Sequence, residues 1–274
     1  MQSDIANGVH SILTESAPID IHANINKGCP LVVFLNGNFP RSDSLKLPTF
    51  SGLGVLPQKH GVSRICISDP SLYLSPDLCL SWYGGSSQLA LQHELRTILS
   101  RIFEVSQPNR IIFAGGSGGG FASLYFSSFF PGSLAFVWNP QTNILEYNPA
   151  HVIKYASVSF GCVGGIDDAR NILRSSIDVK LSDFYTTNPN SVLYLQNNSD
   201  WHTKKHLMPF LKEALGLDDL PTTTSGLIRR DFYLHLDNWG DGHVPPPKDL
   251  ITAILHHLTT SGSSLDDAFN SWRP

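Results

Sequence analysis

Short, continuous apolar runs recur along this chain, and they constrain its fold more than any other feature of the sequence. Residues 31–35 read LVVFL, and 64–68 and 110–114 have a similar character. Such runs are typical of strands that are buried on both faces, because a strand with one solvated face alternates apolar and polar residues. Three more runs complete the set of expected strands: 134–138, 191–196 and 231–236.

Segments with helical periodicity separate these runs. Apolar residues between Leu91 and Ile102 recur at a spacing of three and four, which predicts an amphipathic helix. Similar patterns begin near Phe121, Leu207 and Leu250. Strands that alternate with helices predict an α/β fold, with a mostly parallel central sheet and helices on both faces.

The 274 residues suit one domain spanning 1–274. Residues 9–14 and 19–25 could pair as an antiparallel hairpin before the main sheet. Residues 139–190 read irregularly, and we expect an excursion over the sheet edge or a small cap. The Ser- and Gly-rich tail after Thr259 is expected to be loosely attached.

Composition excludes several classes of protein. The 19 basic residues are outnumbered by 23 acidic ones, which argues against nucleic-acid and anionic-membrane partners. The apolar runs fall far short of the roughly 20 residues of a membrane span, and the N-terminus has no signal-peptide pattern. The four cysteines form no CxxC pair or disulfide framework. We therefore expect a cytoplasmic protein, with its oligomeric state left open.

A glycine-rich turn, 114–121 (AGGSGGGF), follows an apolar run and opens a helical pattern. Residues 115–119 satisfy G-x-S-x-G, the nucleophile elbow, with Ser117 at its centre. A serine on so tight a strand-to-helix turn needs glycine neighbours, and its hydroxyl projects above the sheet near unpaired helix amides. No Lys-Ser/Thr follows, so the turn is not a P-loop, and Ser123 stands where a dinucleotide fingerprint needs glycine.

This turn and its strand–helix setting resemble the α/β-hydrolase superfamily, over roughly Leu31 to Leu258. The resemblance implies a catalytic triad in the order serine, acid, histidine. His243, in the glycine-flanked loop before the last helix, is the expected base. Asp200, after the strand at 191–196, is the expected acid, while Asp237 and Asp241 remain alternatives. A competing interpretation makes Asp200 only a helix N-cap.

Acyl transfer also needs amide donors aimed at an oxyanion. One donor should be the backbone N–H of Gly118, directly after the nucleophile. The resemblance places the second in the loop after 31–35, where this chain has Asn36-Gly37 in place of the common His-Gly pair. We expect Asn38, beside Gly37, to supply it, although Asn-Gly is also simply a good turn dipeptide.

Polar and aromatic residues at strand ends are the expected substrate contacts, since ligands bind there in such sheets. They are Asn36, Trp82, Tyr83, Asn139, Gln141 and Trp201. A pocket that mixes amides with aromatic rings would suit a polar, sugar-bearing substrate. The segments 82–84 and 139–142 are also similar to those of bacterial proteins linked with surface-glycan synthesis, some of which are glycan O-acetyltransferases.

His202 and His206 have the i, i+4 spacing of a metal-binding pair, but no Cys or HExxH arrangement accompanies them, so we expect no metal and no cofactor. The leading hypothesis is ester hydrolysis or acyl transfer through Ser117, Asp200 and His243 on a small-molecule or glycan substrate. The alternative is a catalytically silent scaffold of the same fold that binds a glycan or a protein partner.

Overall fold

A computed structural model describes residues 5–42, 46–56, 61–187, 190–219, 225–229 and 231–260. The strands are β1 (Gly8–Ile12), β2 (Ile19–Asn24), β3 (Leu31–Leu35), β4 (Ser63–Ile67), β5 (Ile111–Gly116), β6 (Leu134–Trp138), β7 (Ser191–Asn197), β8 (Ser225–Arg229) and β9 (Phe232–Asp237). The α-helices are α1 (Leu91–Ser106), α2 (Gly118–Ser127), α3 (Pro149–Phe160), α4 (Ile166–Ser176), α5 (Ser182–Tyr185), α6 (Met208–Leu215) and α7 (Lys248–Thr260). Shorter turns are η1 (Pro70–Leu74), η2 (Ile144–Glu146) and the π-helical η3 (Thr203–Leu207).

Within these residues, the strands form one mixed sheet in the order β1-β2-β4-β3-β5-β6-β7-β9-β8. The six strands from β4 to β9 in that order run parallel, and antiparallel pairs close both edges. The expected α/β fold with a mostly parallel sheet is therefore confirmed, as is the hairpin of β1 and β2. The tail after Thr259 lies almost wholly outside the described residues.

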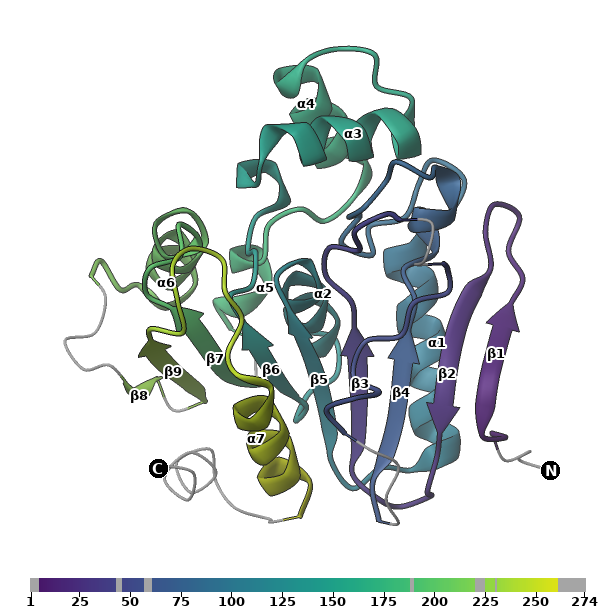
Figure 1. Cartoon of the computed structure of the whole chain (residues 1–274), viewed down its shortest axis with the longest axis vertical. Helices are drawn as coiled ribbons and strands as arrows, with labels where there is room; N and C mark the ends of the chain where they lie inside the picture. Colours follow the sequence, from purple (N-terminus) through teal and green to yellow (C-terminus); the bar gives the residue numbers. More distant parts are fainter. Residues whose placement is uncertain are drawn as a thin grey trace.

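Two hydrophobic layers cover the sheet, one on each face. Because side chains alternate along a strand, Val33 packs into one layer while Val32 and Phe34 pack into the other. Helix α7 covers the second layer, whereas α1 and α2 belong to the first; Figure 1 shows them on opposite sides of the sheet. Strands β3 and β4 are buried on both faces, as their continuous apolar runs predicted.

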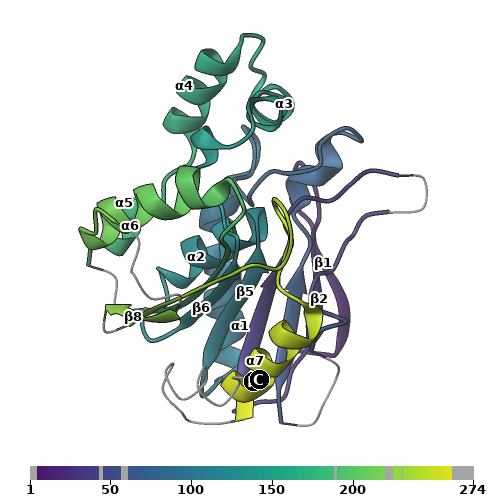
Figure 2. The ribbon, with the colours of Figure 1, turned by 60° about the vertical axis from the view of Figure 1, so that its left-hand side comes forward.

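Helices α3 and α4 lie beyond the carboxyl ends of the parallel strands, as Figures 1 and 2 show from two directions. Tyr155 on α3 donates a hydrogen bond to the carbonyl of Gly85 at 3.0 Å, which ties this pair to the rest of the domain. In its described part, the irregular segment expected at 139–190 thus contains three α-helices and the short η2, and strand β8 was not expected. No helix among the described residues is long and apolar enough to cross a membrane.

Candidate active site

Ser117 occupies the tight turn between β5 and α2, with a φ of 55° that non-glycine residues rarely adopt. Glycines surround it because neighbouring backbone leaves no room for side chains. A Cβ at Gly119 would lie 2.2 Å from the carbonyl oxygen of Leu35, and one at Gly115 would lie 2.5 Å from the carbonyl oxygen of Gly119. The backbone geometry is therefore that of a nucleophile elbow.

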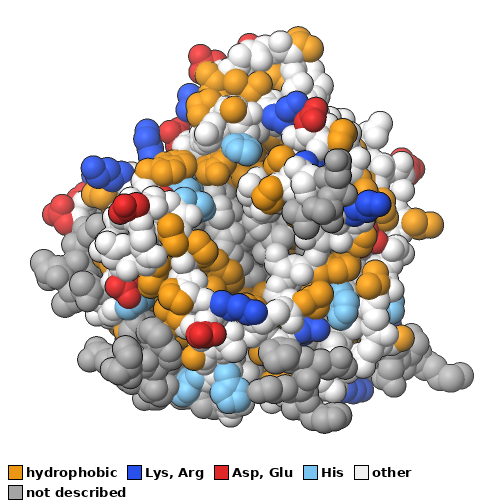
Figure 3. Space-filling view, in the orientation of Figure 1, with side chains coloured by type: hydrophobic (Ala, Val, Ile, Leu, Met, Phe, Trp, Pro, Cys, Tyr) orange, Lys and Arg blue, Asp and Glu red, His pale blue; other side chains and the backbone are white. Residues whose placement is uncertain are grey.

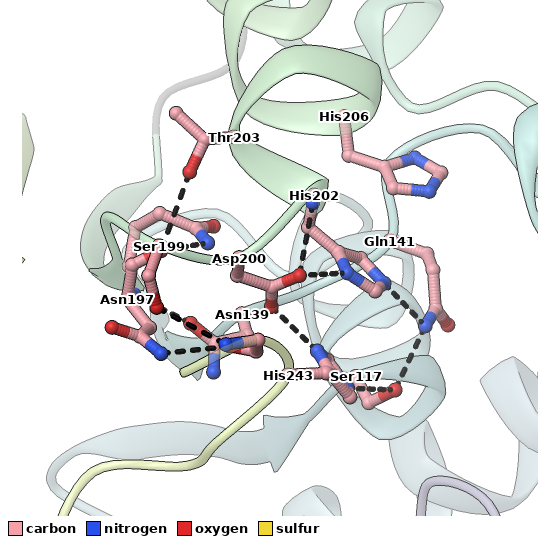
Figure 4. Close-up of polar contacts among 12 residues, drawn as sticks. Ser117, Asn139, Gln141, Asn197, Ser199, Asp200, His202, Thr203, His206 and His243 are labelled. Atoms are coloured by element: carbon pink, nitrogen blue, oxygen red, sulfur yellow. Dashed lines mark hydrogen bonds and ion pairs between the residues drawn. The ribbon is translucent and has the colours of Figure 1, made fainter. Parts of the chain in front are cut away.

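Three side chains from distant loops form a hydrogen-bonded chain at this turn (Figure 4). The Oγ of Ser117 lies 3.0 Å from Nε2 of His243. Nδ1 of His243 lies 2.5 Å from Oδ2 of Asp200. An ionised carboxylate can only accept, so Nδ1 carries the proton and Nε2 is free to accept from the serine. This arrangement can pass a hydroxyl proton to the imidazole.

The environment of Asp200 keeps its carboxylate ionised. Burial by itself would raise the pKa of Asp200, but hydrogen bonds from His202 and His243 outweigh it and hold the pKa well below its usual range. The two alternative acids, Asp237 and Asp241, have exposed side chains. Neither makes a hydrogen bond or ion pair to His243 within the described residues.

Buried amides hold the loop that carries His243. Asn197, at the end of β7, donates from Nδ2 to the carbonyls of Gly240 and Gly242, each at 2.8 Å. Asn139, at the end of β6, donates to the carbonyl of Val244 at 2.8 Å and accepts from the backbone N–H of Asn197 at 2.7 Å. The ends of two neighbouring strands thus fix the position of the imidazole.

The expected oxyanion donors lie close to the nucleophile. A Cβ at Gly37 would be 2.8 Å from the carbonyl oxygen of Gly116 and 3.6 Å from the amide nitrogen of Gly118, so only glycine permits this approach of the two turns. The backbone N–H groups of Gly118 and Asn38 have no acceptor among the described residues. Gly118 directly follows Ser117 and Asn38 lines the same pocket as Ser117, so these two amides remain the candidate oxyanion donors.

A pocket of about 400 Å³ opens at Ser117, and Figure 3 shows the hollow in this face of the molecule. Its lining includes Asn38, Asn139, Tyr147 and His243, together with apolar side chains of β3 and β6. Of the six expected substrate contacts, Asn139 lies on this lining.

The other five expected contacts do not line the pocket. Asn36 and Tyr83 are buried against each other, with the tyrosine hydroxyl 2.5 Å from the Asn36 side-chain oxygen. These two side chains stabilise the loop after β3 and do not line the pocket. Trp82 is also buried, whereas Trp201 is 40% exposed and stacks on Tyr147, with ring centroids 5.6 Å apart.

Gln141 and His202 are placed in a way that the sequence did not predict. Nε2 of Gln141 lies 2.8 Å from the Oγ of Ser117 and 3.0 Å from Nε2 of His202. Nδ1 of His202 lies 2.7 Å from Oδ1 of Asp200, and its ring stacks on His243 with centroids 4.2 Å apart. The one available signal was position, since Gln141 closely follows a strand end and His202 follows the expected acid by two residues.

One group of side chains in the described part of the chain has metal-ligand spacing: Asp200, His202 and His243, whose ligand atoms lie within 4.8 Å of one another. His206, the other member of the suspected pair, is not among them. Nδ1 of each imidazole already makes a hydrogen bond to the carboxylate. A metal ion bound at those two nitrogens would have to displace both ring protons.

The sheet order, the elbow and the loops at the carboxyl ends of the strands define the α/β-hydrolase fold, and this chain has it. The capsule O-acetyltransferase of Neisseria meningitidis serogroup A superposes with a TM-score of 0.63 at 13% identity, covering 91% of this chain and 97% of that one. A mutant of that enzyme has been solved in complex with CoA.

Two further solved structures share this fold. An S-formylglutathione hydrolase from Agrobacterium tumefaciens has a TM-score of 0.51 and 15% identity, covering 93% of this chain and 95% of that one. The glycosylation associate protein (Gap123) complex from Streptococcus agalactiae has a TM-score of 0.62 and 12% identity, over 93% of this chain and 47% of that one. No protein-family model matches the sequence, and no curated protein sequence matches it.

Proposed function

We propose that this protein is a serine enzyme that breaks an ester through a covalent acyl intermediate on Ser117. The observation that carries the proposal is the hydrogen-bonded chain from Ser117 through His243 to Asp200, built on an elbow whose serine has a positive φ. Backbone strain of this kind is costly and is concentrated at functional sites.

The proposed reaction has two steps. The Oγ of Ser117 attacks the carbonyl carbon of the substrate while its proton passes to Nε2 of His243, which then protonates the leaving group. Asp200 stabilises the imidazolium, and the amides of Gly118 and Asn38 hold the oxyanion, with Gly37 allowing their approach. Water or another hydroxyl then loses its proton to His243 and takes the acyl group, and His243 passes that proton to the Oγ of Ser117 as the acyl–oxygen bond breaks. These steps need no metal ion and no bound cofactor.

A finer version of the proposal names a sugar hydroxyl as the acyl acceptor. The exposed Trp201 stacks on Tyr147, which also lines the pocket, so the pair offers a flat apolar surface beside the nucleophile. A capsule O-acetyltransferase with the same fold supports this choice. Acetyl transfer from acetyl-CoA to an oligosaccharide, measured against hydrolysis of the same donor, distinguishes a transferase from an esterase.

In this proposal residues 139–190 form a small cap on one domain that spans 1–274. Tyr147, from this segment, contributes to the pocket lining, and α3 and α4 lie beyond the strand ends that carry the site. Access to Ser117 would then be limited by the cap, as it is by lids that exclude water from active sites.

A fluorophosphonate probe tests the assignment of the nucleophile. We expect covalent labelling of the wild-type protein and none of Ser117→Ala, detected as a mass shift on the peptide that contains residue 117. Ser117→Ala should stay folded, because the substitution removes only a partly exposed hydroxyl. If the well-folded wild type resists the probe, the catalytically silent scaffold that binds a glycan or protein becomes the better explanation.

A further inference from the structure

The Oγ of Ser117 has a second partner besides His243. Nε2 of Gln141 lies 2.8 Å from it, and the Gln141 side chain is completely buried. The other end of that amide is fixed as well, since Trp82 donates from its indole nitrogen to Oε1 at 2.9 Å. Figure 4 shows Gln141 between Ser117 and His202.

These contacts permit one arrangement of protons. The indole N–H of Trp82 can only donate, so the atom of Gln141 that faces it must be the oxygen. The amide nitrogen therefore directs its two hydrogens at the Oγ of Ser117 and at Nε2 of His202. His202 must accept there, so its one ring proton is on Nδ1 and is donated to Asp200.

The result is a second route from Asp200 to Ser117, parallel to the route through His243. His202 is neutral in this arrangement, and burial favours the same state, because it lowers the pKa of His202. Each polar atom of Gln141 and each ring nitrogen of His202 has a partner. A fully satisfied buried network of this kind holds its members in one geometry.

We propose that Gln141 is a catalytic residue, which donates a hydrogen bond to the reacting oxygen of Ser117, and that His202 is the positioning residue that orients it. This inference rests on the proposed function. As the bond from Oγ to the acyl carbon forms, the serine proton goes to His243 while the Gln141 N–H continues to donate to Oγ. When that bond breaks in the second step, the same N–H stabilises the charge that returns to Oγ, and His243 gives the proton back.

His202 does not compete with His243 for the serine proton. Its Nε2 is occupied by the Gln141 amide, and it makes no hydrogen bond to Ser117 in the described part of the chain. Its contribution is to keep one Gln141 hydrogen directed away from the serine, so that the other hydrogen is aimed at Oγ.

Gln141→Glu tests the proposal, because an ionised glutamate keeps the shape of the side chain and an acceptor for Trp82 but has no hydrogen to donate to Ser117. We expect the maximal rate of labelling by a fluorophosphonate to fall about 100-fold, the scale found when one oxyanion-hole donor is removed. The probe concentration at half-maximal rate should stay near the wild-type value. Gln141→Met, which keeps the volume and has no donor, should show the same loss.

Gln92→Glu is the matched control, since Gln92 is another buried glutamine, bonded to the backbone of Asp178 and not part of the pocket lining at Ser117. It should label at the wild-type rate. Ring ¹⁵N NMR gives a second readout: His202, assigned by its loss in His202→Asn, should be protonated on Nδ1 alone in the wild type and on both nitrogens in Gln141→Glu.

The outcomes separate the two proposals. If wild type and Ser117→Ala both resist the probe, the proposed function fails. If wild type labels and a folded Gln141→Glu or Gln141→Met labels equally fast, only the role of Gln141 is overturned. A His202 signal that does not change in Gln141→Glu would overturn the proton arrangement.

Discussion

Among single residues, Asp200 has a carboxylate that accepts three hydrogen bonds, all from histidines. Its Oδ1 accepts from the backbone N–H of His202 at 3.0 Å and from the ring of His202 at 2.7 Å, while Oδ2 accepts from His243. Both imidazoles are therefore held in the tautomer with the proton on Nδ1. An uncharged amide in place of this carboxylate would donate from one of its two atoms and disturb one of those tautomers.

Asp200→Asn should consequently lower kcat by about 10⁴, the scale found when a triad acid becomes an amide. Ester turnover by the purified variant measures this loss. Asp237→Asn and Asp241→Asn are matched controls on the strand and loop next to His243, and each should stay close to the wild-type rate. If either control loses that much activity while Asp200→Asn stays active, the triad acid is the control residue and not Asp200.

The residues at the site were predictable to different degrees. Ser117, Asp200 and His243 could be singled out because an elbow motif and strand-end loops mark them in the sequence, and the structure brings their side chains within hydrogen-bond distance. The contacts of Gln141 could not be foreseen. Its partners Ser117 and His202 are 24 and 61 positions away in the sequence, and no local sequence pattern predicts contacts over such separations.

At the scale of elements, the approach of α2 to β3 depends on the absence of a side chain at Gly119. A Cβ there would lie 2.2 Å from the carbonyl oxygen of Leu35 and 2.9 Å from the carbonyl carbon of Asn36, and backbone cannot move aside as a flexible side chain can. The helix that carries the elbow would have to shift away from the strand. That shift would also displace Gly118 and its amide from the site.

Gly119→Ala should therefore reduce the free energy of unfolding by about 1–3 kcal/mol, the usual cost of overpacking, and should lower the labelling rate as well. Urea denaturation measures the first effect. Gly165→Ala is the control, because a Cβ at Gly165 meets nothing within 4 Å and its φ is negative. Equal stability of the two variants would show that α2 and β3 are not tightly packed.

Elements were predicted well where burial determines the sequence pattern and poorly elsewhere. Strand β3 is buried on both faces and reads as an unbroken apolar run. Helix α4 buries only Ala169 and Leu173, and its short apolar stripe lies in a segment whose other residues are mostly polar. Helix α3 did have signals, since Asn148 caps its start before Pro149 and Gly161 ends it in the left-handed conformation.

At the scale of the whole molecule, the alternation of strands and helices predicted the layers, but strand order comes from contacts between distant segments. After β3, for example, the chain forms β4 on one side of that strand. It must then return past β3 to form β5 on the opposite side. The same order brings the ends of β5, β6 and β7 together, and with them Ser117, Gln141 and Asp200. The site is thus a consequence of the topology.

Buried neutral histidines also couple the stability of the whole fold to pH. Burial lowers the pKa of His206 to about 3, and His206 is fully buried with its Nδ1 accepting from the backbone N–H of Thr142 at 3.3 Å. Its Nε2 has no hydrogen-bond partner among the described residues, so a charged ring would have none there. An unfolded histidine has a pKa near 6.5, so the unfolded chain binds more protons than the native fold between about pH 6.5 and 3.

Stability should accordingly be full above pH 6.5 and fall as the pH decreases toward 3, by up to about 1.4 kcal/mol per pH unit for each such histidine. The lowered pKa of Asp200 acts in the same direction at still lower pH, because protonating that carboxylate also favours unfolding.

Urea denaturation at a series of pH values measures the slope. His206→Gln keeps an acceptor for Thr142. It should reduce the slope of the free energy of unfolding against pH, between pH 6.5 and 4, by the equivalent of about one bound proton. His256→Gln, an exposed control on α7, should leave it unchanged. A slope that is the same in wild type and His206→Gln would mean that His206 is protonated in the native fold, which its burial without a partner for Nε2 argues against.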